Sequence, residues 1–306
     1  TDGGGAMIFF KDLLERYLEE KYFLVKNKEE FEERMKKTKR ESEWGKQEIK
    51  TFTSLSFNSD CYLSKGILAW YENKDIIAFK RYLSISGKLK ILGHSRIDWA
   101  YHGDIVLQFF PEIMSDNPLI HQFLINNLND ICLEDKPDYH KGWGTTLFMN
   151  RNLLLALKGD WEALKKRSLI FLNDVPSGHK KYILTHEFYL ALSEANVDEM
   201  KKALKPIMDP KKGKILARDT FYDLEFYLQP QLLLFGKIAS IHGYNLEIDL
   251  DIAPKELIKY QPLTVKEYEE ADKEYPLITK YDFKEPFINW IAKMTQIEEE
   301  YKSGRK

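Results

Sequence analysis

Apolar residues recur at helical spacing along most of the chain. Positions three and four apart predict an amphipathic helix over residues 9–18. The heavily charged stretch 28–49 predicts a long, mostly solvated helix. A third helix is expected through residues 63–71, with Asn58 or Ser59 as its N-cap. This periodicity indicates a helical protein.

A helix–turn–helix pattern occurs three times, with polar turns at residues 72–75, 158–160 and 193–198. The second and third copies start 35 residues apart, at 153 and 188, and helical solenoid repeats have a period of about 34 residues. In each copy an aspartate is expected to cap the second helix. These aspartates are Asp75, Asp160 and Asp198. We therefore predict an all-α fold of stacked antiparallel helical hairpins, irregular and solenoid-like.

Proline and glycine divide the second half into shorter elements. Pro230 is expected to begin a helix that ends at His242-Gly243, where glycine can take the left-handed conformation. Apolar and acidic residues alternate over 246–250, which predicts one short extended segment. Short helices follow, and the last is expected over residues 285–302.

The composition adds limits to this picture. We predict one helical domain over residues 1–306, in which 1–6 read as an expression remnant, and the alternative is a subdivision into 7–140 and 141–306. Two lone cysteines, no signal-peptide pattern after Met7 and no long uncharged apolar run predict a cytoplasmic protein without a membrane span. The formal net charge of −2 argues against a dedicated nucleic-acid binder.

The titratable residues offer two candidate catalytic sites. His186-Glu187 begins like a zinc-protease helix, but Leu190 stands where the second histidine ligand is required. Asp98, His102 and Asp104 could form a proton-transfer cluster, although a structural pairing is the favoured interpretation. We expect no catalytic residue, no cofactor and no metal, and therefore not an enzyme.

Acidic charge is concentrated in the second half. Residues 219–285 contain 14 acidic residues against seven lysines, a net charge of −7, with tyrosines interleaved among them. Acidic charge steers a basic partner, and tyrosine offers rigid contact area; simple solubility and half-buried tyrosines are the competing interpretation. The predicted partner-binding residues are Asp219, Tyr222, Asp223, Glu225, Tyr244, Glu247, Asp249 and Asp251.

Several short motifs follow one another in a fixed order over residues 150–281. They are Gly159-Asp160-Trp161, the HEFYLAL stretch 186–192 with Asp198-Glu-Met200, residues 234–244 and 246–250, APKEL at 253–257 and YQPL at 260–263. In this order they resemble the family called immunity protein 49 of bacterial polymorphic toxin systems. The resemblance implies an all-α protein that binds a cognate toxin and blocks it without catalysis. A related helical family that neutralises nucleases points to a nuclease-type toxin.

Two other functions compete with this one. A helical-repeat scaffold would bind peptide segments of several partners in a groove with regularly spaced Asn or Lys ligands. An enzyme with an unrecognised site would require a polar cavity with strongly perturbed titratable groups. The sequence leaves the oligomeric state open.

Overall fold

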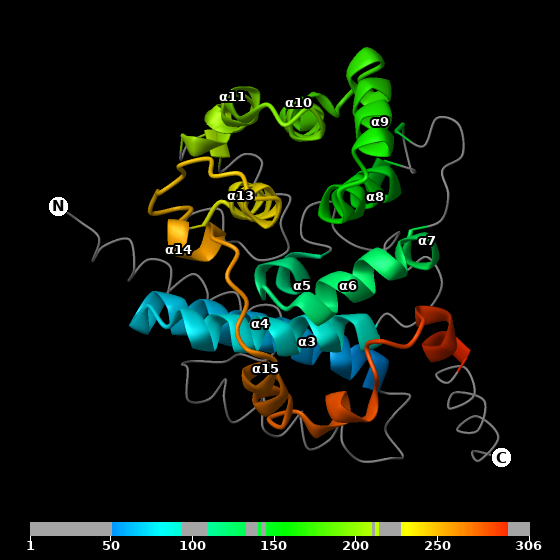
Figure 1. The fold of residues 1–306 in the computed structure, drawn as a ribbon, viewed down its shortest axis with the longest axis vertical. Helices are drawn as coiled ribbons and strands as arrows, with labels where there is room; N and C mark the ends of the chain where they lie inside the picture. Colours follow the sequence, from blue (N-terminus) through cyan, green and yellow to red (C-terminus); the bar gives the residue numbers. More distant parts are fainter. Residues whose placement is uncertain are drawn as a thin grey trace. The chain divides into compact units, whose positions relative to one another are not determined.

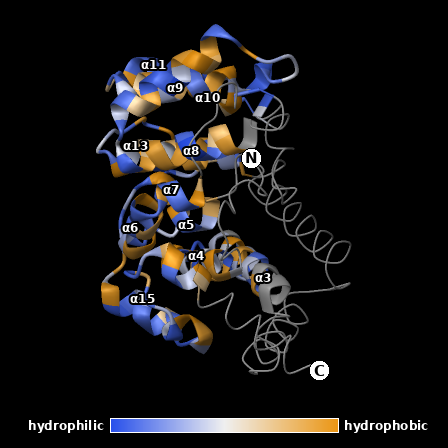
Figure 2. Cartoon of the chain, turned by 90° about the vertical axis from the view of Figure 1, so that its right-hand side faces the viewer, coloured by the Kyte–Doolittle hydropathy of each residue, from blue (hydrophilic) through white to orange (hydrophobic). Residues whose placement is uncertain are grey.

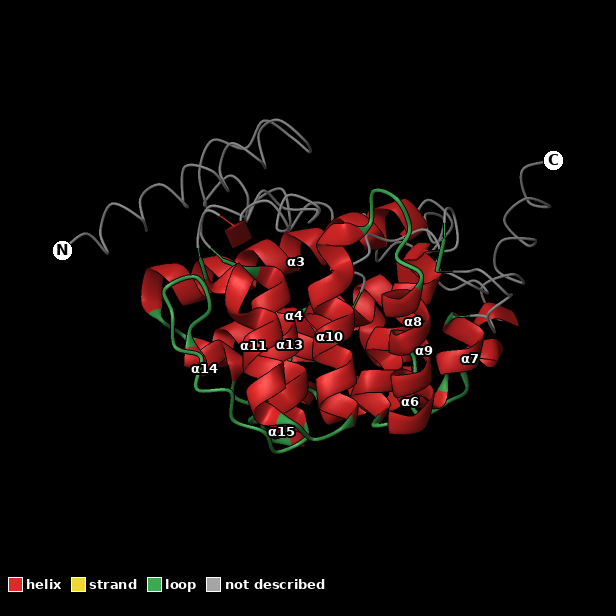
Figure 3. Ribbon diagram, turned by 90° about the horizontal axis from the view of Figure 1, so that it is seen from above, coloured by secondary structure: helices red, strands yellow, loops and turns green. Residues whose placement is uncertain are grey.

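The predicted all-α fold is confirmed by the structure, a computed structural model (Figures 1 and 3). It describes residues 51–93, 109–132, 140–141, 145–209, 212–213 and 228–292. Contacts divide the chain into two compact units. Unit 1 comprises Thr1–Trp99, Ser115–Asp130 and Gln261–Lys306, and unit 2 comprises Ala100–Met114 and Ile131–Tyr260. No boundary between the units falls between residues 140 and 141, where the alternative subdivision was predicted. The single domain stays a prediction.

Unit 1 is built around a hairpin of two long helices, α3 (Thr51–Asn73) and α4 (Ile76–Gly93), which pack along their length. Gly66 permits their close approach, because a Cβ there would lie 2.5 Å from Leu83 Cδ1 and 3.3 Å from the Phe79 carbonyl oxygen. The other elements are α6 (Pro118–Asn126), α15 (Val265–Asp272) and the 3-10 helix η6 (Pro276–Lys280), with α7 (Leu128–Ile131) at the boundary.

Aromatic rings fill the core where α6 meets the C-terminal part of unit 1. Phe123 of α6 stacks on Trp290 with 4.9 Å between ring centroids, and Phe283 meets Trp290 edge-on at 4.7 Å. Trp290 and Phe123 are almost completely buried. Because offset and edge-to-face pairs stabilise beyond the area they bury, this cluster fixes the C-terminal chain onto α6.

Unit 2 contains two further hairpins and a central apolar helix. Its elements are α5 (Phe110–Met114), α8 (Thr145–Lys158), α9 (Trp161–Asn173), η4 (Lys180–Tyr182), α10 (Ile183–Ser193), α11 (Val197–Met208), α13 (Pro230–Ile241) and α14 (Lys255–Ile258). Helix α10 packs against both α9 and α11. Helix α11 is amphipathic, with buried residues three and four positions apart at 200, 203, 204 and 207, and Figure 2 shows its mixture of hydrophobic and hydrophilic residues.

The three predicted hairpins are present, and their turns share one local geometry. The residue before each second-helix cap has a positive φ, which is 53° at Lys74, 78° at Gly159 and 54° at Ala195. An Asp or Asn follows directly, and its side chain accepts an N–H of the second helix at 2.9–3.3 Å. These caps are Asp75, Asp160 and Asn196. The left-handed residue closes one helix and the side chain opens the next, so the turn stays short.

Two of the cap predictions are wrong. Helix α11 begins at Val197 with Asn196 as its N-cap, so Asp198 lies inside the first turn. Asn58 and Ser59 lie within α3, where Asn58 Nδ2 donates to the Tyr275 hydroxyl at 2.7 Å instead of capping a helix. At α11, two neighbouring polar residues could each form the cap, and Asn196 does so. In α3, the Asn58 side chain forms a long-range bond instead of capping a helix.

Other predictions concern the chain ends and the helix α13. Pro230 is the first residue of α13, and the helix ends at His242-Gly243 with Gly243 at φ 85°, as predicted. Of the predicted helix 285–302, residues 285 and 286 are not helical, residues 287–292 are helical, and residues 293–302 lie outside the described residues. The helices predicted over 9–18 and 28–49 also lie outside them.

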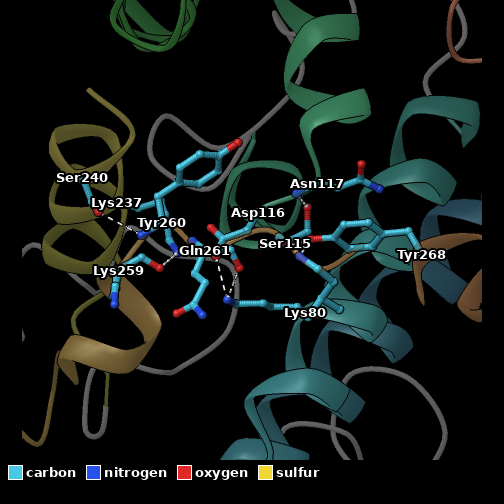
Figure 4. A network of polar contacts seen from close by, with 11 residues as sticks. Lys80, Ser115, Asp116, Asn117, Lys237, Ser240, Lys259, Tyr260, Gln261 and Tyr268 are labelled. Carbon is cyan, nitrogen blue, oxygen red and sulfur yellow. Dashed lines mark hydrogen bonds and ion pairs between the residues drawn. The ribbon is translucent and has the colours of Figure 1, made fainter. Parts of the chain in front are cut away.

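A buried ion pair joins α4 to the turn before α6 in unit 1 (Figure 4). Lys80 Nζ lies 2.9 Å from Asp116 Oδ2, and the two side chains are 5% and 0% exposed. Both also bind the backbone of Gln261: Lys80 donates to its carbonyl at 2.5 Å, and Asp116 accepts its N–H at 3.1 Å. Buried charges persist only when an opposite charge and hydrogen bonds surround them, so these contacts fix the Gln261 peptide.

The two preceding residues are fixed within unit 2 in a similar way (Figure 4). The fully buried Lys237 donates from Nζ to the Lys259 carbonyl at 2.9 Å. The Ser240 hydroxyl accepts the N–H of Tyr260 at 2.8 Å. Backbone groups of a non-helical segment are thus satisfied by side chains of α13, as buried polar groups require.

The left-handed turns give a first prediction. We expect Ala195→Gly to raise the free energy of unfolding by about 0.5–1 kcal/mol, because glycine takes a positive φ without the steric penalty of a Cβ. As a control, Ala203→Gly in α11 should lower it by about 1 kcal/mol or more, since glycine is a poor helix former. Urea unfolding followed by circular dichroism measures both. A loss of stability in both variants would contradict the proposed role of the turn.

The buried ion pair gives a second prediction. Lys80→Met removes the positive charge that lies 2.9 Å from the buried Asp116 carboxylate and should lower the free energy of unfolding by about 3–5 kcal/mol. Adding Asp116→Asn removes the carboxylate charge and should recover part of the loss. Lys202→Met, at an exposed lysine paired with Glu199, should change stability by about 0.5 kcal/mol or less. If the double variant were no more stable than Lys80→Met, the buried charge of Asp116 could not explain the loss.

Candidate binding surface

The eight predicted partner-binding residues fall into two groups. Asp219, Tyr222, Asp223 and Glu225 lie outside the described residues. The other four lie between α13 and α14 in one non-helical segment of unit 2, residues 244–251, which we call the acidic segment. They are Tyr244, Glu247, Asp249 and Asp251.

Backbone hydrogen bonds fix the acidic segment at both ends. At its start, the Tyr244 N–H donates to the Ala239 carbonyl at 2.9 Å, the bond that closes α13 after the left-handed Gly243. At its end, Leu250 and Ala253 exchange two backbone hydrogen bonds of 3.2 and 2.9 Å and form an isolated antiparallel bridge. The predicted extended piece is therefore a short non-helical segment that carries a single bridge.

Burial alternates along the acidic segment as predicted. Leu246 and Ile248 are 4% and 6% exposed, whereas Glu247, Asp249 and Asp251 are exposed. The chain is not regularly extended here, because Glu247 has a positive φ of 55° and its N–H donates to Asn245 Oδ1 at 2.9 Å. Burial of Leu246 and Ile248 on either side of this turn leaves the three carboxylates in solvent.

Lysines of unit 2 pair with two of the three carboxylates. Glu247 binds Lys201 of α11, and Asp249 Oδ2 lies 2.9 Å from Lys255 Nζ. Hydrogen bonds from these lysines lower the pKa values of the Glu247 and Asp249 carboxyl groups below their ordinary values. The structure describes no hydrogen bond or ion pair for the Asp251 carboxylate among the described residues. The segment is thus exposed, and lysines neutralise part of its negative charge. The sequence analysis predicted neither ion pair. Lys255 lies only six positions from Asp249, so its proximity in sequence was the one available signal.

Other acidic residues of the stretch 219–285 pair with lysines of the two long helices of unit 1. Lys88 of α4 pairs with Asp272, and Lys65 of α3 pairs with Glu274, each at 2.5 Å. Burial raises the pKa of the Asp272 carboxyl, and the charge of Lys88 opposes this shift. Two of the interleaved tyrosines, Tyr268 and Tyr275, are buried, so they are core residues and not surface contacts.

A hollow of about 380 Å³ opens between α4 and α15 in unit 1. Its lining includes four carboxylates, those of Asp75, Glu267, Glu270 and Glu274, together with Arg81. Each carboxylate has a partner in the chain, because the first two cap helices and the other two pair with lysines. The hollow is therefore polar but largely compensated in charge.

His186, considered above for zinc chemistry, is a core residue of unit 2. It is fully buried, its ring stacks on Phe171 with centroids 3.8 Å apart, and neither ring nitrogen has a hydrogen-bond partner among the described residues. Burial, together with the nearby charges of Arg167 and His140, lowers its pKa to about 3. His186 is consequently neutral near pH 7.

Among the described residues, no three His, Cys, Asp or Glu side chains come together as a group that could hold a metal ion. The candidate cluster of Asp98, His102 and Asp104 lies outside the described residues. No described helix is long and apolar enough to cross a membrane.

Two of the motifs that carry the family resemblance meet in unit 2. Trp161 contacts the His242 ring edge-on with 4.6 Å between centroids, and His242 Nε2 donates to the Ala156 carbonyl at 2.7 Å. A Cβ on Gly159 would lie 3.3 Å from both rings, and its φ is 78°. The Gly-Asp-Trp turn and the C-terminal end of α13 thus pack against each other.

Comparisons with protein-family models, curated proteins and solved structures found no match. The family resemblance therefore rests on the quoted residues alone.

Burial of His186 predicts a dependence of stability on pH. Its pKa is about 3 in the folded chain and about 6.5 in an unfolded one, so between these values the unfolded state binds the extra proton. The free energy of unfolding should fall as the pH drops below about 6.5, with a contribution of about 3 kcal/mol by pH 4.

The variant His186→Leu isolates this contribution. Between pH 7 and pH 4 it should lose about 3 kcal/mol less stability than the original chain, as measured by urea unfolding at each pH. Leu190→Met, at a non-titrating residue of the same helix, should follow the original chain. Equal losses in all three proteins would show that His186 does not titrate as its burial implies.

Proposed function

We propose that this chain binds and neutralises a cognate bacterial toxin in the cytoplasm, and that the acidic segment forms part of its binding surface. The observation that carries the proposal is the outward row of Glu247, Asp249 and Asp251 on a backbone held by buried Leu246 and Ile248. Fixed carboxylates orient and speed the approach of a basic polypeptide. The half-buried Tyr244 adds aromatic contact area beside them.

The lysines that pair with the acidic segment are compatible with such a role. Lys255 and Asp249 are 65% and 53% exposed, and Glu247 is 72% exposed. Ion pairs in contact with water add little stability, because solvent screens them and the side chains lose entropy. A lysine or arginine of a partner can replace Lys201 or Lys255 at little cost.

The family resemblance supports the choice of a toxin as the partner, and a nuclease as its class. A nuclease carries a basic surface for the phosphates of its substrate. Carboxylates held in a row can take the places of those phosphates and cover that surface. Effective neutralisation requires a dissociation constant near nanomolar, which corresponds to a binding free energy of about −12 kcal/mol. Such affinity usually comes from a few desolvated anchor residues surrounded by charged ones.

Candidate nuclease toxins co-expressed with this chain in bacteria provide the first test, since restored growth identifies the cognate toxin. The variant Glu247→Gln/Asp249→Asn/Asp251→Asn should then slow association with that toxin by about tenfold or more at low salt, because steering depends on local charge. Dissociation should change less. Surface plasmon resonance at several salt concentrations measures both rates.

A charge-matched control separates local from global effects. Glu162→Gln/Glu187→Gln/Glu269→Gln removes three exposed carboxylates elsewhere and should slow association by less than about threefold, since salt screens distant charges. If both triple variants slowed association equally, the acidic segment would not be part of the toxin-binding surface. If the chain neither bound nor neutralised any candidate, the proposed function itself would be wrong.

A further inference from the structure

No further inference is drawn: the strongest candidate, the hollow between α4 and α15 in unit 1, rests on a cluster of acidic side chains whose carboxylates the chain's own lysines and helix N-termini already bind, and nothing in the structure shows what would fill it.

Discussion

The buried ion pair between Lys80 and Asp116 sets the arrangement of unit 1. An ammonium group in a protein core loses its hydration, and only an opposite charge together with hydrogen-bond acceptors offsets that loss. Asp116 and the Gln261 carbonyl supply both. Helix α4, the turn before α6 and the start of the C-terminal chain must therefore meet at one point, and a displacement of any of them would leave a charge buried without its partner.

The same requirement changes how the acidic excess of the C-terminal region is interpreted. Lysines of α3 and α4 take up part of it, because Lys65 pairs with Glu274 and Lys88 with Asp272. These partners are separated by 209 and 184 residues along the chain, so charge counted in a sequence window cannot show where it is neutralised. Net charge over a window describes a surface only when its counter-charges are local, and here several of them are distant.

Local interactions made the helices and turns predictable from the sequence. The hairpins, the caps Asp75 and Asp160, and the left-handed Gly243 all depend on neighbouring residues, and all are present. The predictions for Asn58 and Asp198 failed because side chains able to cap a helix also bond across the fold or compete with a neighbour. The alternation at 246–250 was predictable in burial, whereas the partner of Glu247, Lys201, came from another helix and gave no sequence signal.

The acidic segment therefore has a narrower physical role than its composition indicates. Three carboxylates and two bound lysines leave a single net negative charge on its surface. Without the carboxylates, the two lysines would leave a charge of +2 that repels a basic partner. At contact, a partner's cations replace Lys201 and Lys255 beside carboxylates that Leu246 and Ile248 hold in place. Exchange of one surface ion pair for another changes the free energy little. The carboxylates thus determine orientation, and a tight complex requires apolar contacts that lose water, for which Tyr244 is placed at the start of the same segment.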